Sequence, residues 1–267
     1  MLLFWVIMYK LIAVDFDGTL LDDKKMMSIK TINKFKSLRE KGYLIVAVTA
    51  RNFNSAKAVV DINLFDYLIV NNGAYLYDVR LKKGETLGVI SKDSVLNIIN
   101  DVKNVSNDII VISNYNYFYY KGKFPFRYFF DKKINSLDKI KEDIMRINII
   151  INNEFDINYY NDFIRNKYLD VNCFIMQDSG SNNKRISVNP KGINKKNILE
   201  KLALSLNIKL EEIIFFGDGL NDVELIESVG CGVAMKNAVS EVKDKAKYIA
   251  LSNNEDGIVA FLDKFLD

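Results

Sequence analysis

The 267-residue sequence contains no histidine and only two cysteines, Cys173 and Cys231. Without histidine, Ser-His-Asp and Cys-His catalysis and the usual histidine-bearing zinc sites are excluded. The two cysteines do not form a C-x-x-C motif, so neither a disulfide scaffold nor a cysteine zinc site is expected, and a reducing, cytoplasmic location fits. Acid–base chemistry must therefore rest on Asp, Glu, Lys or Tyr, and any metal site must be rich in oxygen ligands, which favours a hard cation such as Mg²⁺.

The chain also lacks a strong net charge and a long hydrophobic run. Its formal charge of +3 gives no case for a nucleic-acid partner. The first seven residues are apolar, but Lys10 comes well before the roughly 18–20 apolar residues that a membrane span requires. We interpret this run as an extension of the first strand or as residues ahead of a later start at Met8, with an anchor as the less favoured alternative, and we expect no membrane partner. A monomer and a homodimer are both compatible with the sequence.

Apolar strands alternate with amphipathic helices over the first 70 residues. Strands are expected at Lys10–Val14, Tyr43–Val48 and Tyr67–Val70, with helices at Ser28–Lys41 and Ser55–Asn63 between them. Fully apolar strands of this kind are buried on both faces of a parallel sheet, and their alternation with helices is typical of α/β folds. The pattern predicts a Rossmann-like, doubly wound parallel-sheet core.

The alternation stops after the third strand and resumes near residue 190. The intervening pattern is α+β and begins with a hairpin around Lys83-Gly84. Helices are expected near Ser94–Val102, Leu137–Met145 and Tyr159–Asn166, and strands near Ile109–Ile112, Tyr115–Tyr120, Phe126–Phe130, Ile147–Ile151, Cys173–Gln177 and Arg185–Val188. We therefore predict residues 1–83 as the first part of an α/β core domain, residues 84–188 as an inserted cap domain, and residues 189–267 as the second part of the core domain.

Polar side chains follow three of the expected core strands. The first strand runs into Asp15 and Asp17, the second ends at Thr49, and a later one ends in the G-D-G-L-N-D run at residues 217–222. Ligands bind beyond the carboxyl ends of parallel strands, so these side chains are expected at one edge. Crowded carboxylates call for a compensating divalent cation, and Mg²⁺ combines one or two carboxylates with water and a substrate phosphate. The pattern predicts a phosphate-accepting Mg²⁺ site, to which Thr49 could donate a hydrogen bond and Lys195 a positive charge.

Together these motifs resemble the haloacid dehalogenase (HAD) superfamily of phosphohydrolases. V-D-F-D-G-T-L-L resembles its first motif, V-T-A-R at residues 48–51 its second, Lys195 in G-I-N-K its third, and G-D-G-L-N-D its fourth. Their order and spacing are similar to the Cof-type branch, whose type IIB cap is inserted between the second and third motifs. The resemblance implies a Mg²⁺-dependent phosphatase that acts on small phosphorylated metabolites, with sugar phosphates favoured.

The resemblance also implies a catalytic role for each matched residue. Asp15 would attack phosphorus to form an aspartyl-phosphate, and Asp17 would protonate the leaving oxygen and then deprotonate the hydrolytic water. Thr49 and Asn221 would hold phosphoryl oxygens, and Lys195 would balance the charge on the nucleophile and the phosphate.

The implied metal site is formed by the same strand ends. Asp15, Asp218 and the backbone carbonyl of Asp17 would bind Mg²⁺, while Asp222 would hold the metal's waters or orient the lysine. Arg51 and Asn72 are candidates for substrate contact, with a structural role as the equal alternative.

Two other functions remain open on the sequence alone. A phosphomutase of the same superfamily would transfer the phosphoryl group to another hydroxyl, whereas a phosphatase releases free phosphate. A non-catalytic receiver-like switch also gathers Asp, Thr and Lys around Mg²⁺, although the insertion and the G-D-G-L-N-D run count against it. A dehalogenase is not favoured, because Asp17 and Asp218 are not needed there.

Overall fold

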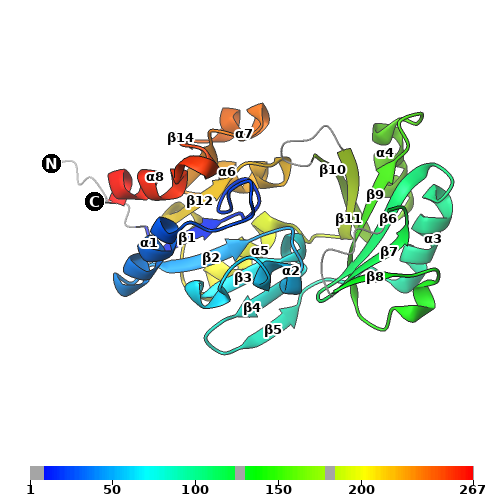
Figure 1. The fold of residues 1–267 in the computed structure, drawn as a ribbon, viewed down its shortest axis with the longest axis horizontal. Helices are drawn as coiled ribbons and strands as arrows, with labels where there is room; N and C mark the ends of the chain where they lie inside the picture. Colours follow the sequence, from blue (N-terminus) through cyan, green and yellow to red (C-terminus); the bar gives the residue numbers. More distant parts are fainter. Residues whose placement is uncertain (1–8, 124–129, 178–183, 267) are drawn as a thin grey trace.

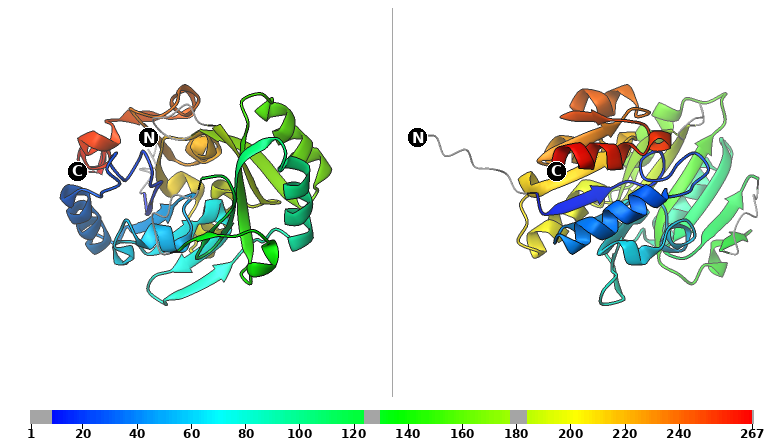
Figure 2. Two further views of the ribbon diagram at one scale, coloured as in Figure 1. Left: turned by 45° about the vertical axis from the view of Figure 1, so that its right-hand side comes forward. Right: turned by 60° about the vertical axis from the view of Figure 1, so that its left-hand side comes forward.

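The computed structural model describes residues 9–123, 130–177 and 184–266. The apolar N-terminal run and residues 126–129 of one expected strand lie outside these ranges. Figure 1 shows two sheets side by side, the core domain on the left and the cap domain on the right, and Figure 2 shows the same division from two further directions. No helix within the described ranges is long and apolar enough to cross a membrane.

The core domain is built on an eight-stranded sheet in the order β14-β13-β12-β1-β2-β3-β4-β5. The first six strands of this order pair in parallel, and β4 and β5 add an antiparallel hairpin at the edge. The strands are β1 (Leu11–Val14), β2 (Leu44–Val48), β3 (Tyr67–Val70), β4 (Tyr75–Asp78), β5 (Lys83–Thr86), β12 (Ile213–Gly217), β13 (Cys231–Met235) and β14 (Tyr248–Ala250). The central strand β1 is fully buried, as an all-apolar strand of a parallel sheet should be.

Helices cover both faces of this sheet, which confirms the predicted doubly wound α/β core (Figure 2). The helix α1 packs against α8, and α6 packs against α5 and α7. The helices are α1 (Ile29–Glu40), α2 (Phe53–Lys57), α5 (Lys195–Ser205), α6 (Val223–Ser228), α7 (Ser240–Lys245) and α8 (Gly257–Leu266). The sequence pattern did not predict α7.

The prediction of a helix at Ser55–Asn63 is wrong in both the length of the helix and its first residue. The predicted helix is replaced by the short α2 and a 3₁₀ turn at Ile62–Leu64. Asn52 caps the helix by accepting a hydrogen bond from the backbone N–H of Ser55, so the helix starts earlier than predicted. A second cap, in which Asp61 accepts from the N–H of Asn63, starts the 3₁₀ turn and keeps the two segments separate.

The cap domain is a six-stranded sheet in the order β10-β11-β9-β6-β7-β8, antiparallel except for the β7–β8 pair. Figure 1 shows the helices α3 and α4 on the face of this sheet that points away from the core domain. The elements are α3 (Lys92–Val102), β6 (Ser106–Ser113), β7 (Tyr117–Lys121), β8 (Asp131–Lys133), β9 (Ile144–Ile151), α4 (Ile157–Lys167), β10 (Val171–Gln177) and β11 (Lys184–Pro190). The cap therefore has the predicted α+β character.

The helix expected at Leu137–Met145 is also wrong. Its first residues form a 3₁₀ turn at Leu137–Lys139, and Ile144 already belongs to strand β9, where it pairs with Ser113. The apolar residues Leu137, Ile140 and Ile144 recur at helical spacing, but they are buried in the cap as parts of a turn and a strand. Periodicity over so short an apolar run does not separate a helix from a buried strand.

Two hydrophobic clusters match the two domains. One collects side chains from β1 to β4 and from α5 onward, and the other collects cap residues from Ile90 to Val188. We keep residues 84 and 188 as the proposed limits of the cap, although the sheet of the core domain continues through β5 to Thr86 and β11 runs to Pro190. Met145, at the start of β9, is a buried residue within these limits that packs into the core-domain cluster, and the partly buried Leu87 packs against the same cluster.

Candidate active site

The site lies where β1 and β12 end side by side. The two strands pair in parallel with Val14 opposite Phe216, and the N–H of Asp15 donates to the carbonyl of Phe216 across 3.0 Å. Asp15 and Asp218 are therefore the first residues beyond two neighbouring strands. The polar strand ends that the sequence placed at one edge of the sheet do lie together there.

A buried lysine joins two of the carboxylates. The Nζ of Lys195, the first residue of α5, lies 2.7 Å from Oδ1 of Asp15 and 2.8 Å from Oδ1 of Asp222. Burial raises the pKa of Asp15, and the charges of Asp222 and Asp218 raise it further, so it stands well above its ordinary value although Lys195 opposes the shift. Burial works against the charged form of Lys195, but the two carboxylates outweigh it and raise its pKa. Lys195 is therefore a permanent cation in the site.

The carboxylates of Asp218 and Asp222 are held by further hydrogen bonds. Oδ1 of Asp218 accepts from the hydroxyl of Thr19 at 2.9 Å. Oδ2 of Asp222 accepts from the N–H groups of Asp218 and Gly219, at 3.2 and 3.1 Å. Both oxygens of Asp222 are thus in use, one on Lys195 and one on the loop, so its geometry suits an orienting residue.

The cluster fits a divalent cation. Asp15, Asp218 and Asp222 are buried and each offers a carboxylate oxygen, and these atoms all lie within 4.8 Å of one another. With Lys195, the carboxylate–lysine cluster (Asp15, Asp218, Asp222 and Lys195) carries a formal charge of −2, from three negative groups and one positive group. Oxygen donors and this charge are what Mg²⁺ prefers. The side chain of Asp17 lies outside the cluster.

The residue that follows Asp17 in the sequence must be glycine. Gly18 has a φ of +81°, and a Cβ built on it would lie 2.2 Å from Oδ2 of Asp218. We expect Gly18→Ala to lower the free energy of unfolding by about 1–3 kcal/mol through backbone strain and to lower activity because Asp218 must move. Urea denaturation measures the first effect, and an assay of the phosphate release that the sequence motifs predict measures the second.

Gly42 offers a matched control. It has a φ of +91°, but a Cβ on it would meet nothing within 4 Å. Gly42→Ala should show the loss of stability with unchanged activity. Equal activity in the two variants would contradict the assigned contact between Gly18 and Asp218.

Asp17 is held by two cations. Its carboxylate accepts from Nε and Nη2 of Arg51, at 2.7 and 2.8 Å, and pairs with Lys25 at 2.9 Å. Burial raises the pKa of Asp17, but the hydrogen bonds and charges of Arg51 and Lys25 prevail and lower it to about 2. Sequence reasoning left Arg51 between a substrate contact and a structural role, and it did not find Lys25, which no motif distinguishes from its neighbours.

Hydrogen bonds of Asn72 connect Thr49 with Asn221. Thr49 is buried at the end of β2, and its carbonyl accepts from the N–H of Asn72 at 3.1 Å. The side-chain amide of Asn221 donates to Oδ1 of Asn72 at 3.2 Å, and Asn72 in turn donates to Oδ1 of Asn189 on β11 at 3.3 Å. Asn72, another candidate that the sequence left open, therefore connects the catalytic edge to the cap.

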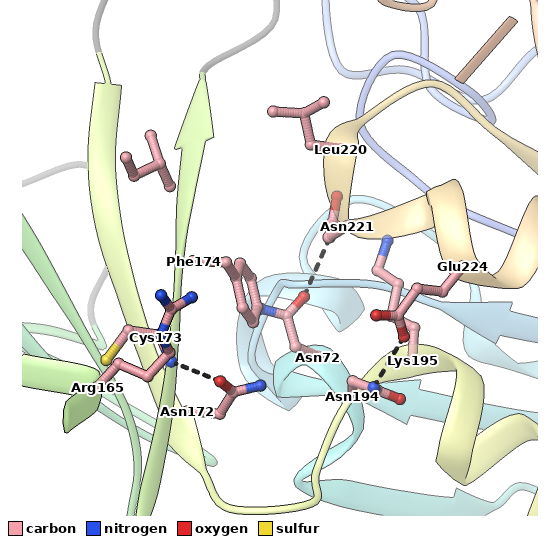
Figure 3. A pocket seen from close by; sticks show the side chains of 11 residues that line it. Asn72, Arg165, Asn172, Cys173, Phe174, Asn194, Lys195, Leu220, Asn221 and Glu224 are labelled. Atoms are coloured by element: carbon pink, nitrogen blue, oxygen red, sulfur yellow. Dashed lines mark hydrogen bonds between the residues drawn. The ribbon is translucent and has the colours of Figure 1, made fainter. Parts of the chain in front are cut away.

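A cavity of about 260 Å³ opens beside the cluster, between strand β10 of the cap and the core domain. Figure 3 shows Lys195 and Asn221 on its core side, with Asn172 and Phe174 facing them from β10. The cap side chains of the cavity were not predicted, because no local sequence signal tells which cap residues face the core domain. The cavity places room for a small substrate next to Lys195.

This architecture defines a class of protein: an α/β core domain with a cap domain and a buried carboxylate–lysine cluster at the strand ends. A family model described as haloacid dehalogenase-like hydrolase matches residues 12–262. The chain belongs to this family, and its function is that of a HAD-family phosphatase. The predicted family is thereby confirmed.

Two curated relatives are phosphatases. The 5-amino-6-(5-phospho-D-ribitylamino)uracil phosphatase YcsE of Bacillus subtilis (strain 168) is 29% identical over 250 residues, which cover 93% of this chain and 92% of that protein. A phosphoglycolate phosphatase of Methanothermobacter thermautotrophicus is 26% identical over 260 residues, covering 96% and 98%.

Solved structures share the fold. A haloacid dehalogenase-like hydrolase from Bacteroides thetaiotaomicron has a TM-score of 0.80 at 24% identity, covering 96% of this chain and 99% of that one. A HAD subclass IIB sugar phosphatase has a TM-score of 0.78 at 23% identity, covering 96% and 98%. The core domain with an inserted cap is therefore the fold of that subclass.

Proposed function

We propose that this protein is a Mg²⁺-dependent phosphatase that hydrolyses small phosphorylated metabolites through an aspartyl-phosphate on Asp15. The observation that carries the proposal is the carboxylate–lysine cluster, in which Lys195 contacts both Asp15 and Asp222. Such a buried cluster has the charge and the donor atoms to receive a cation together with a phosphoryl group.

In the first step, a carboxylate oxygen of Asp15 attacks phosphorus, and the bond between phosphorus and the ester oxygen breaks. The electron pair leaves on the ester oxygen, and Asp17 supplies the proton that makes the alcohol a neutral leaving group. Because Arg51 and Lys25 hold Asp17 as an ion, its contacts with them must give way, and Asp17 must take up a proton from water or from the phosphate monoanion, before this transfer. Lys195 counters the charge that the phosphoryl group brings to Asp15.

In the second step, water attacks the phosphorus of the aspartyl-phosphate. Asp17, now ionised, takes a proton from this water, and the bond between phosphorus and the Asp15 oxygen breaks. Inorganic phosphate leaves, and the Asp15 carboxylate is restored. Thr49 and Asn221 would hold the phosphoryl oxygens during both steps, since they border the same edge of the sheet.

Asp15, Asp218 and the backbone carbonyl of Asp17 would hold Mg²⁺, with Asp222 orienting Lys195 and the loop that carries Asp218. When bound, the ion supplies positive charge that stabilises the transferring phosphoryl group. The hydroxyl of Thr19 and the conformation of Gly18 keep Asp218 in place for this role.

The cavity favours a small polar substrate. Its lining combines amide side chains of both domains with Arg165 and Glu224, and its volume of about 260 Å³ suits a short polar molecule. Phosphatases with ribityl and glycolate phosphates in their names are among the relatives. We favour phosphates of sugars and related polyols on this basis.

The test is a panel of phosphomonoesters assayed for inorganic phosphate, with Mg²⁺ and with EDTA. We expect multiple turnovers on at least one sugar phosphate with Mg²⁺ and none with EDTA. Transfer of the phosphoryl group within the sugar, without free phosphate, would favour a phosphomutase instead. A single phosphorylation of the protein without turnover would favour a receiver-like switch.

A further inference from the structure

We propose that Arg146, on the face of the cap sheet that looks toward the core domain, binds a second anionic group of the substrate. The preferred substrates are then phosphomonoesters that carry a carboxylate or another phosphate at the end away from the reacting phosphoryl group. This inference rests on the proposed phosphatase function and deepens it.

Strand alternation in β9 directs Arg146 toward the core domain, because the next residue, Ile147, faces the helices of the cap, and a bulge then turns Met145 to the same side as Arg146. Strand β9 pairs Ile144 with Ser113 but Arg146 with Ile112, so one extra residue, Met145, stands between the two pairs. Ile144 and Ile147 both belong to the hydrophobic cluster under α3 and α4, whereas Met145 packs into the cluster of the core domain. Arg146 therefore lies on the inner face of the cap sheet, opposite the helices that Figure 1 shows on its outer face.

Arg146 is a buried cation without a counter-charge. Arg146 is only 4% exposed. Its guanidinium forms no hydrogen bond or ion pair within the described residues, and its Nε is fully buried. Burial and the nearby positive charge of Arg185 lower the pKa of Arg146 to about 10, which leaves it charged at neutral pH. A buried guanidinium in this condition is costly unless an anion completes the site.

A row of amide side chains connects the neighbourhood of Arg146 with the catalytic edge. Asn189 and Arg146 directly flank Val188 and Ile147, which are register partners on β11 and β9, so the two polar side chains are neighbours on the inner face. Asn189 accepts from Asn72, and Asn72 accepts from Asn221. The amides of Asn221, Asn72 and Asn189 thus form a continuous path from the cavity to Arg146, along which the distal part of a substrate bound at Asn221 would extend.

The second anion is a different group from the reacting phosphoryl. Apart from burial, the groups that shift the pKa of Arg146 are Tyr117 and Arg185, and no carboxylate of the carboxylate–lysine cluster is among them. Lys195 already supplies the cation next to Asp15. Arg146 is thus placed to bind the end of the substrate that lies away from the reacting phosphoryl group. A guanidinium binds either a carboxylate or a phosphate through two hydrogen bonds, so both are included.

Pairs of esters that differ only in the distal group test the proposal. They are 6-phosphogluconate with glucitol 6-phosphate, phosphoglycolate with 2-hydroxyethyl phosphate, and glucose 1,6-bisphosphate with glucose 6-phosphate. For the wild type, we expect kcat/KM at least tenfold higher for the anionic member of at least one pair. The first two pairs report a carboxylate, and the third reports a phosphate.

Arg146→Met should remove this preference, lowering kcat/KM at least tenfold for the anionic member and less than threefold for the neutral one. Arg146→Lys should keep part of it. Lys133→Met, which removes an exposed cation elsewhere on the cap, should leave the ratio unchanged. As a second measurement, Arg146→Met should melt at the same temperature as the ligand-free wild type or higher, because it removes an uncompensated buried charge.

The outcomes separate this inference from the function on which it rests. Equal kcat/KM within every pair for the wild type, or equal losses on both members in Arg146→Met, would overturn the role of Arg146 while leaving a phosphatase. A lower melting temperature for Arg146→Met would assign Arg146 to the folded structure instead. Absence of phosphate release from every ester, with Mg²⁺ present, would overturn the proposed function itself.

Discussion

Replacement of Asp15 by asparagine is expected to lower the rate of phosphate release by a factor on the order of 10⁴ or more, as for other essential nucleophiles. An amide oxygen is a poor nucleophile, so the covalent step is lost even though the side chain keeps its shape. The variant should fold normally, because an amide oxygen can still accept from Lys195 and one of three crowded carboxylates is gone. Steady-state phosphate release and thermal unfolding measure the two parts.

Asp244→Asn is the matched control for this substitution. Asp244 is exposed on α7, the helix between β13 and β14, and its replacement should leave the rate unchanged. An Asp15→Asn variant that keeps more than about one-tenth of the wild-type rate is incompatible with a nucleophilic Asp15.

Replacement of Lys195 by methionine is expected to have the largest effect on stability. The substitution leaves Asp15 and Asp222 buried without their shared cation, and removing one partner of a buried ion pair costs about 3–5 kcal/mol. We therefore expect a loss of this size in EDTA, together with loss of activity. Because Mg²⁺ supplies positive charge to the same carboxylates, adding it should restore part of the stability but not the activity.

Urea denaturation with EDTA and with Mg²⁺ measures this difference. Lys196→Met is the control, since Lys196 is the next residue of α5 and forms only a partly exposed pair with Glu200 at 3.5 Å. Its effect should stay within about 0.5 kcal/mol. If Lys195→Met in EDTA were as stable as the wild type, Lys195 could not be the cation that compensates the buried carboxylates.

The catalytic edge could be predicted because it depends on strand ends. Asp15 and Asp218 each follow an all-apolar strand, and parallel pairing of β1 with β12 brings such ends together. The same rule placed Thr49 beyond β2. Local sequence and sheet geometry agree here, so the positions followed from the pattern without knowledge of the tertiary contacts.

The interactions of Asp17 could not be read in the same way. Both aspartates of the first motif look alike in the sequence, yet Asp15 meets a buried lysine and Asp17 meets Arg51 and Lys25. The result is a pKa raised for one carboxyl and lowered to about 2 for the other. Such a difference arises from side chains that the fold brings in from other segments, and only the structure reveals them.

The cap was predicted in outline and missed in detail. Its α+β character followed from the end of the regular strand–helix alternation, but the predicted helix at Leu137–Met145 is a turn followed by a strand. This error hides the start of β9 and its bulge at Met145, so the pattern does not show that both Met145 and Arg146 face the core domain. The choice of residues that face the substrate therefore depends on pairing in the cap sheet, which apolar periodicity alone does not determine.

The central claim is that the phosphoryl group passes through Asp15. The most direct measurement is to quench the enzyme in acid during turnover of its best substrate, reduce the acyl phosphate with borohydride, and map the peptides by mass spectrometry. An aspartyl-phosphate on Asp15 predicts homoserine at residue 15 and nowhere else. Homoserine at another aspartate, or none at all while phosphate is being released at steady state, would contradict the account.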